Sequence, residues 1–389
     1  MAEDTRLIHA GLHIDTGKPA PVTVSPVIQK GSTVLLPNAA ALYNDDQYIT
    51  YGRQGLASHE ALKAGLRTLE NACGVELYPS GVAAVTGAML AVISAGDEVL
   101  VTDNIYKPTR RFCDNVLSKF GIATRYFDPS QSPEELIGNA GSKVRLIVME
   151  SPGSLSFELQ DMTAVAALAR QRGILTLADN TWGAGYFYKP LDHGVDISVQ
   201  ALTKYVGGHS DVFMGSAAAS SPKIAELLAD GVLNLGWAVS PEDAYQMLRG
   251  LRTLPTRLAR HDASGRKVAS WLAQRPEVKT VLHPALPGAP GHDLWARDFT
   301  GACGLFGFVL HPTSTEAVNA FHDALKIFGL GFSWGGFESL AIPCDDQLGP
   351  RNVLKSYGGP LVRLHIGLED PDDLIADLER GFVALHSTP

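Results

Sequence analysis

One lysine of the chain stands in surroundings that suit a reactive amine. Lys204 lies in the segment SVQALTKYVGGHSD (residues 198–211), where most neighbours are apolar and the glycine pair Gly207-Gly208 follows closely. Burial lowers the pKa of an amine, and a neutral amine attacks carbonyl groups. The adjacent Thr203 offers a hydroxyl to a phosphate. Alternatively, Lys204 is a structural lysine that reaches the surface with its ammonium group. Other segments of the sequence are needed to choose between the two roles.

Two more side chains that could take part in catalysis or cofactor binding follow apolar runs that are typical of β-strands. Asp179 ends the run LTLAD, where a carboxylate is expensive to bury without a partner. It either caps a turn or pairs with a protonated ring nitrogen. Tyr106 follows the run EVLVTD and is either a core or interface tyrosine or a ring that stacks on a flat cofactor.

A helix start in the segment YPSGVAAV (residues 78–85) suits an anion. Ser80 can cap the helix, and Gly81 lets a ligand approach the backbone closely. The free N–H groups of Gly81 and Val82 would then face a group such as a phosphate. A simple helix cap without a ligand is the alternative.

The elements that must position these residues follow an alternating pattern. Short apolar strands and helices of 10–15 residues alternate from about residue 55, which predicts an α/β fold with a mostly parallel sheet and helices on both faces. A long helical stretch over residues 241–272 leads into a smaller C-terminal α/β domain with strands GLFGFVL and LVRLHIGLE. We therefore expect an arm at 1–54, a cofactor domain at 55–250 and a second domain at 251–389.

Ligands of a parallel sheet bind at the carboxyl ends of its strands, so these four segments are expected to meet. Together they suit an aldehyde, a protonatable ring nitrogen, a flat ring and a phosphate. Pyridoxal 5'-phosphate (PLP) has all four features.

Composition excludes several other classes of function. The net charge of -9 disfavours nucleic acid. The four cysteines are scattered without a CxxC pair, which indicates reduced thiols in the cytoplasm. The polar start MAEDTRLIHA and the short apolar runs predict neither a signal peptide nor a membrane span. The twelve histidines, including His209, lack the spacing of metal ligands, so we expect no metal.

Long motifs along the whole chain resemble the Cys/Met-metabolism family of PLP-dependent enzymes. These motifs are YGRQG, LADNTW, TKYVGGHSDVFMG, LRGLRTLPTRL and LVRLHIGLEDPDDLIADLERGF. The resemblance implies that Lys204 forms the Schiff base with PLP, that Asp179 binds the ring nitrogen and that Tyr106 stacks on the ring. It assigns the phosphate to Gly81, Val82 and Thr203.

The resemblance also implies a shared active site and a substrate clamp. Tyr51 and Arg53 of the irregular arm, which is kept extended by prolines, would reach the phosphate in a neighbouring subunit of a homo-oligomer, expected to be a tetramer. Arg363 would grip the α-carboxylate of an amino-acid substrate, with Ser333 and Trp334 lining the pocket.

Within the family, three local features resemble the bacterial cystathionine β-lyases. They are Trp334 in SWGG, Ala201 three residues before the lysine, and Ser154 in ESPGSL, which leaves the cofactor's ring hydroxyl without an assigned partner. The implied reaction cleaves L-cystathionine to homocysteine, pyruvate and ammonia in methionine biosynthesis, with cysteine and cystine as further candidate substrates. Lys204 would move the Cα proton, and Tyr51 or Tyr106 would assist the exchange of Lys204 for the substrate amine. Cystathionine γ-lyase, γ-synthase and methionine γ-lyase remain the alternatives.

Two readings from other classes also stay open. Residues 331–335 (GFSWG) match the GxSxG elbow of serine hydrolases, with Asp345 or Asp370 and His365 or His386 as partners. The elbow needs a helix directly after its serine, and the glycine pair 335–336 is a poor start for one. A cofactor-binding regulator without turnover is the non-enzymatic reading.

Overall fold

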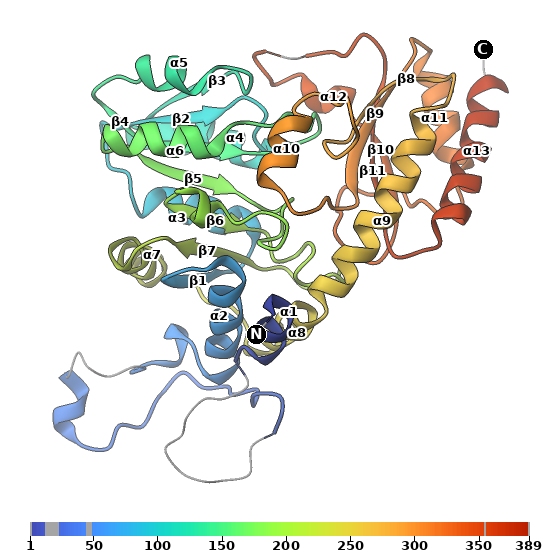
Figure 1. Cartoon of the computed structure of the whole chain (residues 1–389). Helices are drawn as coiled ribbons and strands as arrows, with labels where there is room; N and C mark the ends of the chain where they lie inside the picture. The colour runs from blue at the N-terminus through green and yellow to red at the C-terminus, as the bar shows by residue number, and fades with distance from the viewer. Residues whose placement is uncertain (1, 12–22, 44–48, 354, 388–389) are drawn as a thin grey trace.

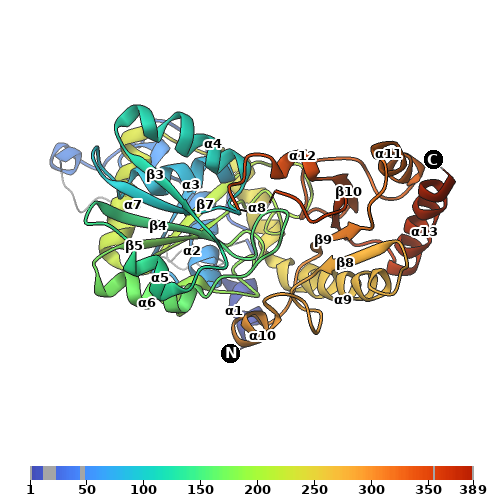
Figure 2. The same cartoon turned by 90° about the horizontal axis from the view of Figure 1, so that it is seen from above.

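The computed structural model describes residues 2–11, 23–43, 49–353 and 355–387, and it contains two sheets. Figures 1 and 2 show them in two lobes, joined by the long helix α9 (Leu254–Leu272). Both lobes combine strands with helices, so the predicted α/β class with a smaller second unit is confirmed. None of the helices in the described part of the chain is both long and apolar enough to cross a membrane.

The first sheet has seven strands in the order β1-β7-β6-β5-β4-β2-β3. The five strands β3, β2, β4, β5 and β6, which are adjacent in this order, run parallel to one another. Strand β7 is antiparallel to both of its neighbours, β1 and β6. The sheet is therefore mostly parallel, as predicted. Its strands are β1 (Gly74–Tyr78), β2 (Glu98–Thr102), β3 (Ala123–Phe127), β4 (Val144–Glu150), β5 (Leu175–Asp179), β6 (Ile197–Gln200) and β7 (Gly215–Ala219).

Helices cover both faces of this sheet because its central strands are apolar on both sides. One buried cluster joins the sheet to helices α3, α4 and α7, and a larger one joins it to α2, α6 and α8. The helices of this lobe are α2 (Ala57–Glu70), α3 (Gly81–Leu90), α4 (Lys107–Asn115), α5 (Pro133–Gly138), α6 (Met162–Gln171), α7 (Pro222–Leu235) and α8 (Pro241–Arg252). Short 3-10 turns lie at Leu117–Phe120 and Pro190–His193.

The second sheet has four antiparallel strands in the order β10-β11-β9-β8. Its core packs against α9 and two further helices, α11 (Thr315–Ala324) and α13 (Pro371–Ser387). The strands are β8 (Val278–Leu282), β9 (Leu305–Leu310), β10 (Leu340–Pro343) and β11 (Leu361–His365), with short helices α10 (His292–Asp298) and α12 (Asp345–Leu348) beside them.

The helical stretch predicted over residues 241–272 is two helices rather than one. α8 ends at Arg252 and α9 begins at Leu254, with a proline in its first turn. A proline there lacks the N–H that would continue the hydrogen-bond ladder, which explains the break. The expected boundary between residues 250 and 251 falls inside the last turn of α8 and remains a proposal.

The expected arm is not extended throughout. Residues Glu3–His9 form helix α1, and Leu7 is buried against α2 and α8. Two of the prolines that predicted an extended arm, Pro19 and Pro21, lie outside the described residues. Ser25 and Lys30 contact α8, and the residues that follow extend away from the body in Figure 1. This segment exposes large apolar side chains, with Leu35 at 92%. Short 3-10 turns occur at Ala39–Tyr43 and Gly52–Gln54.

Candidate active site

The lysine segment leaves β6 and turns sharply beside helix α9. Gly208 has φ +72°, a left-handed conformation that glycine adopts without strain. The buried Arg257 of α9 donates to the carbonyl oxygens of Tyr205 at 2.6 Å and Val206 at 3.2 Å. A Cβ on Gly208 would lie 2.1 Å from an Arg257 nitrogen. The turn therefore fits closely around this guanidinium group.

The amine of Lys204 contacts the loop between α11 and β10. Its Nζ donates to Ser333 Oγ at 2.8 Å and lies 5.3 Å from the centre of the Trp334 ring. The same loop packs on the lysine backbone, because a Cβ on Gly335 would come within 2.8 Å of Lys204 Cα. Burial and the Arg363 charge lower the pKa of Lys204 to about 8. The amine is therefore still mostly protonated near physiological pH, but its neutral fraction is far larger than that of an ordinary lysine.

Asp179 ends β5 with one oxygen satisfied and the other free. Its Oδ1 accepts from the N–H of Thr181 at 3.1 Å and from its hydroxyl at 2.6 Å. No residue in the described ranges hydrogen-bonds to Oδ2. Burial raises the pKa of this carboxyl group, while the Thr181 bonds and the Lys204 charge lower it. A carboxylate with one free oxygen beside a nucleophilic lysine suits a protonated ring nitrogen.

The predicted phosphate site is a helix start that packs against the lysine segment. Ser80 caps α3 by accepting from Ala83 N at 3.1 Å, so Gly81 and Val82 occupy the first two helical positions. Their N–H groups have no partner within the helix. A Cβ on Gly81 would lie 2.5 Å from Ala201 Cβ, so this position admits only glycine without movement.

Thr203 differs from the other predicted phosphate contacts because its hydroxyl already has two partners. Its Oγ1 donates to Met214 O at 3.1 Å and accepts from Met214 N at 3.0 Å. Its N–H also donates to Met214 O, at 3.2 Å, so both donors of Thr203 are engaged. A phosphate contact of Thr203 stays a prediction, and it would require the hydroxyl to turn its hydrogen away from Met214 O.

Tyr106 follows β2 and is 44% exposed. Its N–H donates to Glu150 Oε2 at 2.6 Å, and Ser154 donates to Glu150 Oε1 at 2.6 Å. Glu150 thus ties the predicted stacking tyrosine to the ESPGSL segment. Burial and the Glu150 charge raise the pKa of Tyr106.

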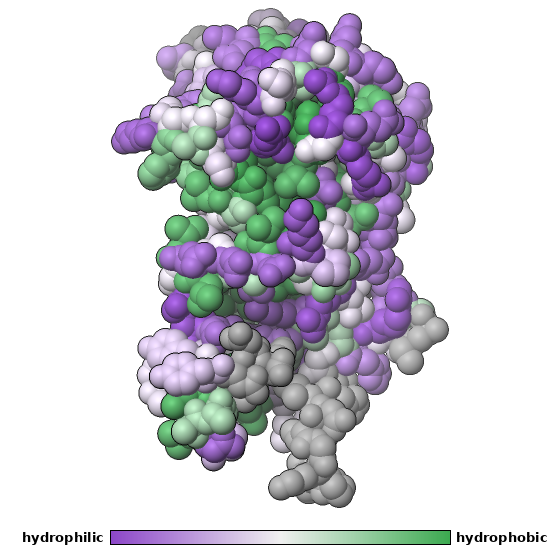
Figure 3. Space-filling view, turned by 90° about the vertical axis from the view of Figure 1, so that its left-hand side faces the viewer, coloured by the Kyte–Doolittle hydropathy of each residue, from purple (hydrophilic) through white to green (hydrophobic). Residues whose placement is uncertain are grey.

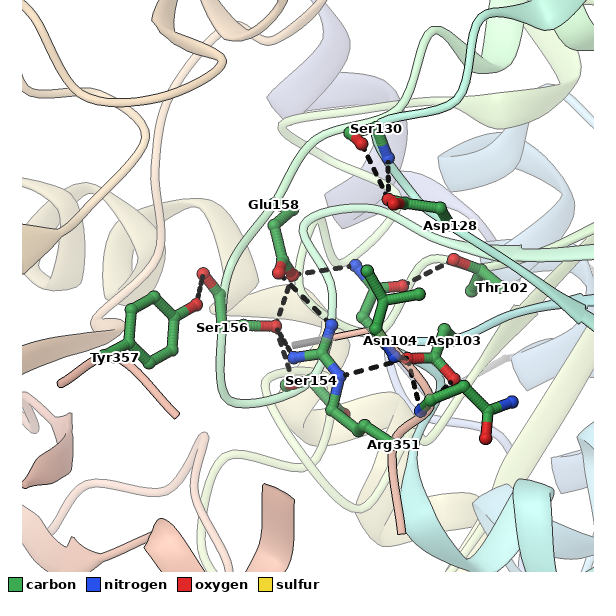
Figure 4. Close-up of polar contacts among 12 residues, drawn as sticks. Thr102, Asp103, Asn104, Asp128, Ser130, Ser154, Ser156, Glu158, Arg351 and Tyr357 are labelled. Atoms are coloured by element: carbon green, nitrogen blue, oxygen red, sulfur yellow. Dashed lines mark hydrogen bonds and ion pairs between the residues drawn. The ribbon is translucent and has the colours of Figure 1, made fainter. Parts of the chain in front are cut away.

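A network of polar side chains holds the neighbouring loops together (Figure 4). Arg351, from the C-terminal lobe, donates to Ser156 Oγ at 2.6 Å and to Glu158 Oε1 at 3.2 Å. The fully buried Asp103 accepts from the N–H groups of Asn352 and Val353. The C-terminal lobe is therefore anchored beside the loop that carries Tyr106.

Arg363 lies in the middle of the β11 strand and faces the Ser333 loop. One nitrogen donates to the carbonyl oxygens of Phe332 and Ser333, each at 3.0 Å, and approaches that of Gly331 at 3.4 Å. Its Nε is buried without a hydrogen-bond partner. The group therefore both shapes the loop and keeps a donor for a ligand such as a carboxylate.

The predicted residues of the arm lie apart from this cluster within one chain. Tyr51 is 49% exposed, and Arg53 donates to Leu233 O at the end of α7 at 3.1 Å. No described contact joins either residue to Lys204 or Asp179. Their expected role in a neighbouring subunit is untested by a single chain.

The geometry does not support the serine hydrolase reading. Ser333 is followed by a loop rather than a helix, and its hydroxyl accepts from Lys204. His365 contacts the backbone of Gly335 and Gly336 instead of Ser333. Among the described residues there is also no cluster that could hold a metal ion.

The residues present fit PLP on structural grounds. The free Oδ2 of Asp179 suits a protonated pyridine nitrogen, the close approach at Gly81 suits a phosphate at a helix start, and Lys204 provides a partly neutral amine. PLP has a group for each of these three features to bind.

Sequence reasoning missed Glu150, Arg257 and Arg351. Glu150 ends an apolar strand, VRLIVME, just as Asp179 ends LTLAD, so the same signal was present. Arg257 and Arg351 gave no local signal, because their partners are backbone groups and side chains distant in sequence.

Comparisons with known proteins agree with this site. A family model described as Cys/Met metabolism PLP-dependent enzyme matches residues 4–383. Among several relatives named cystathionine beta-lyase, that of Bordetella avium is 42% identical, with 96% of each chain covered. The L-alanine/L-glutamate racemase of Wolbachia pipientis wMel is 38% identical over 99% of this chain and 98% of the relative. The crystal structure of cystathionine gamma synthase from Xanthomonas oryzae pv. oryzae in complex with cystathionine matches with a TM-score of 0.90 and 30% identity, covering both chains fully.

Proposed function

The chain belongs to the Cys/Met-metabolism family of PLP-dependent enzymes, and from this premise we propose that it is a carbon–sulfur lyase that cleaves L-cystathionine by β-elimination. The products would be homocysteine, pyruvate and ammonia, which places the enzyme in methionine biosynthesis. The observation that carries the proposal is the contact of Lys204 Nζ with Ser333 Oγ, in a loop that Arg363 holds. Relatives named cystathionine beta-lyase, 39% to 47% identical, support the choice of substrate.

PLP, held by Lys204, Asp179 and the helix start at Gly81, would supply an electron sink that makes loss of a sulfur group from Cβ possible. Each remaining task falls to side chains of this chain. Lys204, with a pKa of about 8, takes the Cα proton at Nζ, and Ser333 orients that nitrogen. Asp179 keeps the ring nitrogen protonated through its free Oδ2. Arg363 holds the α-carboxylate of the substrate.

Trp334 and Ser154 support β- over γ-cleavage, because they resemble the β-lyase pattern of the family. The ring of Trp334 lies against Tyr205 and near Lys204, so it forms part of the wall of the amine's pocket. Ser154 donates to Glu150 Oε1 at 2.6 Å, so it lies beside the end of β4 and the loop of Tyr106.

The deciding experiment identifies the keto acid that purified holoenzyme forms from L-cystathionine. Pyruvate would establish β-elimination, whereas 2-oxobutyrate would show a γ-lyase. Lys204→Ala serves as the inactive control. Chiral analysis of L-alanine and L-glutamate incubations tests the second candidate, an amino-acid racemase, which the similarity to the Wolbachia protein favours. Fast racemisation without any keto acid would refute the lyase proposal.

We further propose a homo-oligomer, a tetramer with pairwise shared active sites, working in the cytoplasm. Exposed apolar side chains in residues 23–43 and at Leu233 and Leu235 of α7 support a partner surface. Figure 3 shows hydrophobic residues gathered on one face of the molecule. Among the residues described, all four cysteines are free, which suits a reducing compartment.

Mixing two inactive variants tests the shared site. If Arg53 acts in the partner's site, hybrids of Lys204→Ala and Arg53→Ala subunits contain one intact site, and about a quarter of wild-type activity should return. A mixture that stays inactive after subunit exchange, while light scattering shows a tetramer, would refute sharing through Arg53.

A further inference from the structure

A second carboxyl group lies directly beside Asp179. Glu150 is the last residue of β4 and Asp179 the last of the parallel neighbour β5, and the two are paired in register. Side chains paired in this way project from the same face, with their strands about 4.8 Å apart. Glu150 therefore brings a carboxyl group next to the one that faces the cofactor's ring nitrogen.

Glu150 uses both of its oxygens to hold the surroundings of the cofactor. Oε2 accepts from the N–H of Tyr106, and Oε1 is hydrogen-bonded to Ser154 Oγ, each at 2.6 Å. None of the ion pairs between described residues includes Glu150, in contrast to Glu158 in the same loop, which pairs with Arg351. Glu150 thus contacts the loops that carry Tyr106 and Ser154 without forming an ion pair with a described lysine or arginine.

The charges around the pair favour one proton on Glu150. The charged or titratable groups that face it are Asp179, Tyr106 and the more distant Arg351, whereas Lys204 acts on Asp179. Burial and the Asp179 charge raise the pKa of Glu150 well above its usual range. Burial also raises the pKa of Asp179, but the Thr181 bonds and the nearby Lys204 charge stabilise its charged form, and among the described residues Glu150 has no lysine beside it. Two neighbouring carboxylates cannot both ionise easily without a shared cation.

We propose that Glu150 is a positioning residue that stays uncharged beside Asp179, so that the carboxyl pair carries a single negative charge at the ring nitrogen. In the ionised form Ser154 Oγ donates to Oε1. A neutral Glu150 reverses that bond and donates from Oε1 to Ser154 Oγ, while its other oxygen still accepts from the N–H of Tyr106. The inference rests on the proposed cofactor site. It is independent of the lyase reaction, because the bound cofactor can be observed without substrate.

The test compares Glu150→Gln with Glu150→Ala as holoenzymes. An amide reproduces the neutral acid, with its oxygen accepting from Tyr106 and its NH2 donating to Ser154. The pH midpoint of the cofactor's absorbance change should therefore stay within about 0.3 unit in Glu150→Gln, because the charge of the carboxyl pair is unchanged. Glu150→Ala loses both bonds, and we expect its affinity for PLP to fall about tenfold.

Glu158→Gln is the matched control, because Glu158 lies in the same loop but bonds to Asn104, Ser156 and Arg351 instead of facing Asp179. It should leave the absorbance midpoint unchanged. A shift of about one unit or more in Glu150→Gln would show a charged Glu150 and overturn the proposal. Unchanged PLP affinity in a folded Glu150→Ala would also overturn it. If Glu150→Ala does not fold, Glu150→Gln alone decides.

Discussion

At the scale of single residues, the site depends on groups whose environment changes their charge. Lys204 is the clearest case, since an ordinary lysine is almost fully protonated at neutral pH while this one has a pKa of about 8. Burial is the main cause, and the Arg363 guanidinium adds to it. The positive charge of Arg363 thus serves twice, because it also suits a substrate carboxylate.

The capture of PLP by cofactor-free protein should follow the neutral form of Lys204. Because the pKa is lowered from 10.5 to about 8, the neutral fraction and the capture rate should reach half of their maximum near pH 8 and level off above about pH 9. Stopped-flow absorbance would measure this rate. A rate that keeps rising through pH 10 would indicate an ordinary exposed lysine, and Lys204→Ala should show no covalent capture.

Arg363→Lys should weaken the grip on the substrate although the charge is kept. A lysine cannot reproduce the planar fork that bonds to the Phe332 and Ser333 carbonyls and keeps Nε free. We expect the KM for L-cystathionine to rise about tenfold or more. Steady-state kinetics would measure it, with the more exposed Arg260→Lys as a control. An unchanged KM would argue against the carboxylate role.

At the scale of elements, the lysine segment is shaped by a helix that follows it by about fifty residues. α9 places Arg257 against the carbonyl oxygens of the turn, and Gly208 leaves the space that the guanidinium occupies. The position of Lys204 thus depends on the packing between the lysine turn and α9 as much as on β6.

Gly208→Ala should therefore be more damaging than an alanine at a glycine with a similar backbone angle. Gly121 has φ +69° and nothing within 4 Å of an added Cβ, so Gly121→Ala should cost only the strain of about 1 kcal/mol. Gly208→Ala adds a clash with Arg257 and should lower the free energy of unfolding by about 2–3 kcal/mol. Urea unfolding of both variants measures the difference, and equal losses would refute the close fit.

At the scale of the whole molecule, the site lies where two lobes are fastened together. Arg351 of the C-terminal lobe donates to Ser156 and Glu158 of the first lobe (Figure 4). The backbone N–H groups of the next two residues, Asn352 and Val353, donate to Asp103. Tyr106 comes from one lobe and Arg363 from the other, so this junction fixes their separation.

Arg351→Met should destabilise the fold and loosen the site together. The change removes the hydrogen bonds to Ser156 and Glu158, whereas Asp103 keeps its closer ion pair with Arg110, so we expect a cost of about 2 kcal/mol. The exposed Arg125–Glu98 pair provides the control, because Arg125→Met should cost less than about 1 kcal/mol. Denaturant midpoints and KM would be compared. Equal, small effects of both changes would show that the junction contributes little.

The sequence by itself determined the fold class and the strand-end residues of the site. Alternating apolar runs predict a parallel sheet, and the side chains that follow those runs, such as Asp179 and Tyr106, lie at one edge because parallel strands end together. The break between α8 and α9 could have been found from Pro255, since proline marks a helix start.

Only the tertiary structure decided how those residues are charged and held. The pairing of Glu150 with Asp179, the contact of Ser333 with Lys204 and the reach of Arg351 join segments far apart in sequence, and no local pattern encodes such distances. The pKa of a group depends on burial and on neighbouring charges, which exist only after folding. The sequence therefore predicts which reactive residues the site contains, whereas their protonation states depend on contacts that form only in the folded structure.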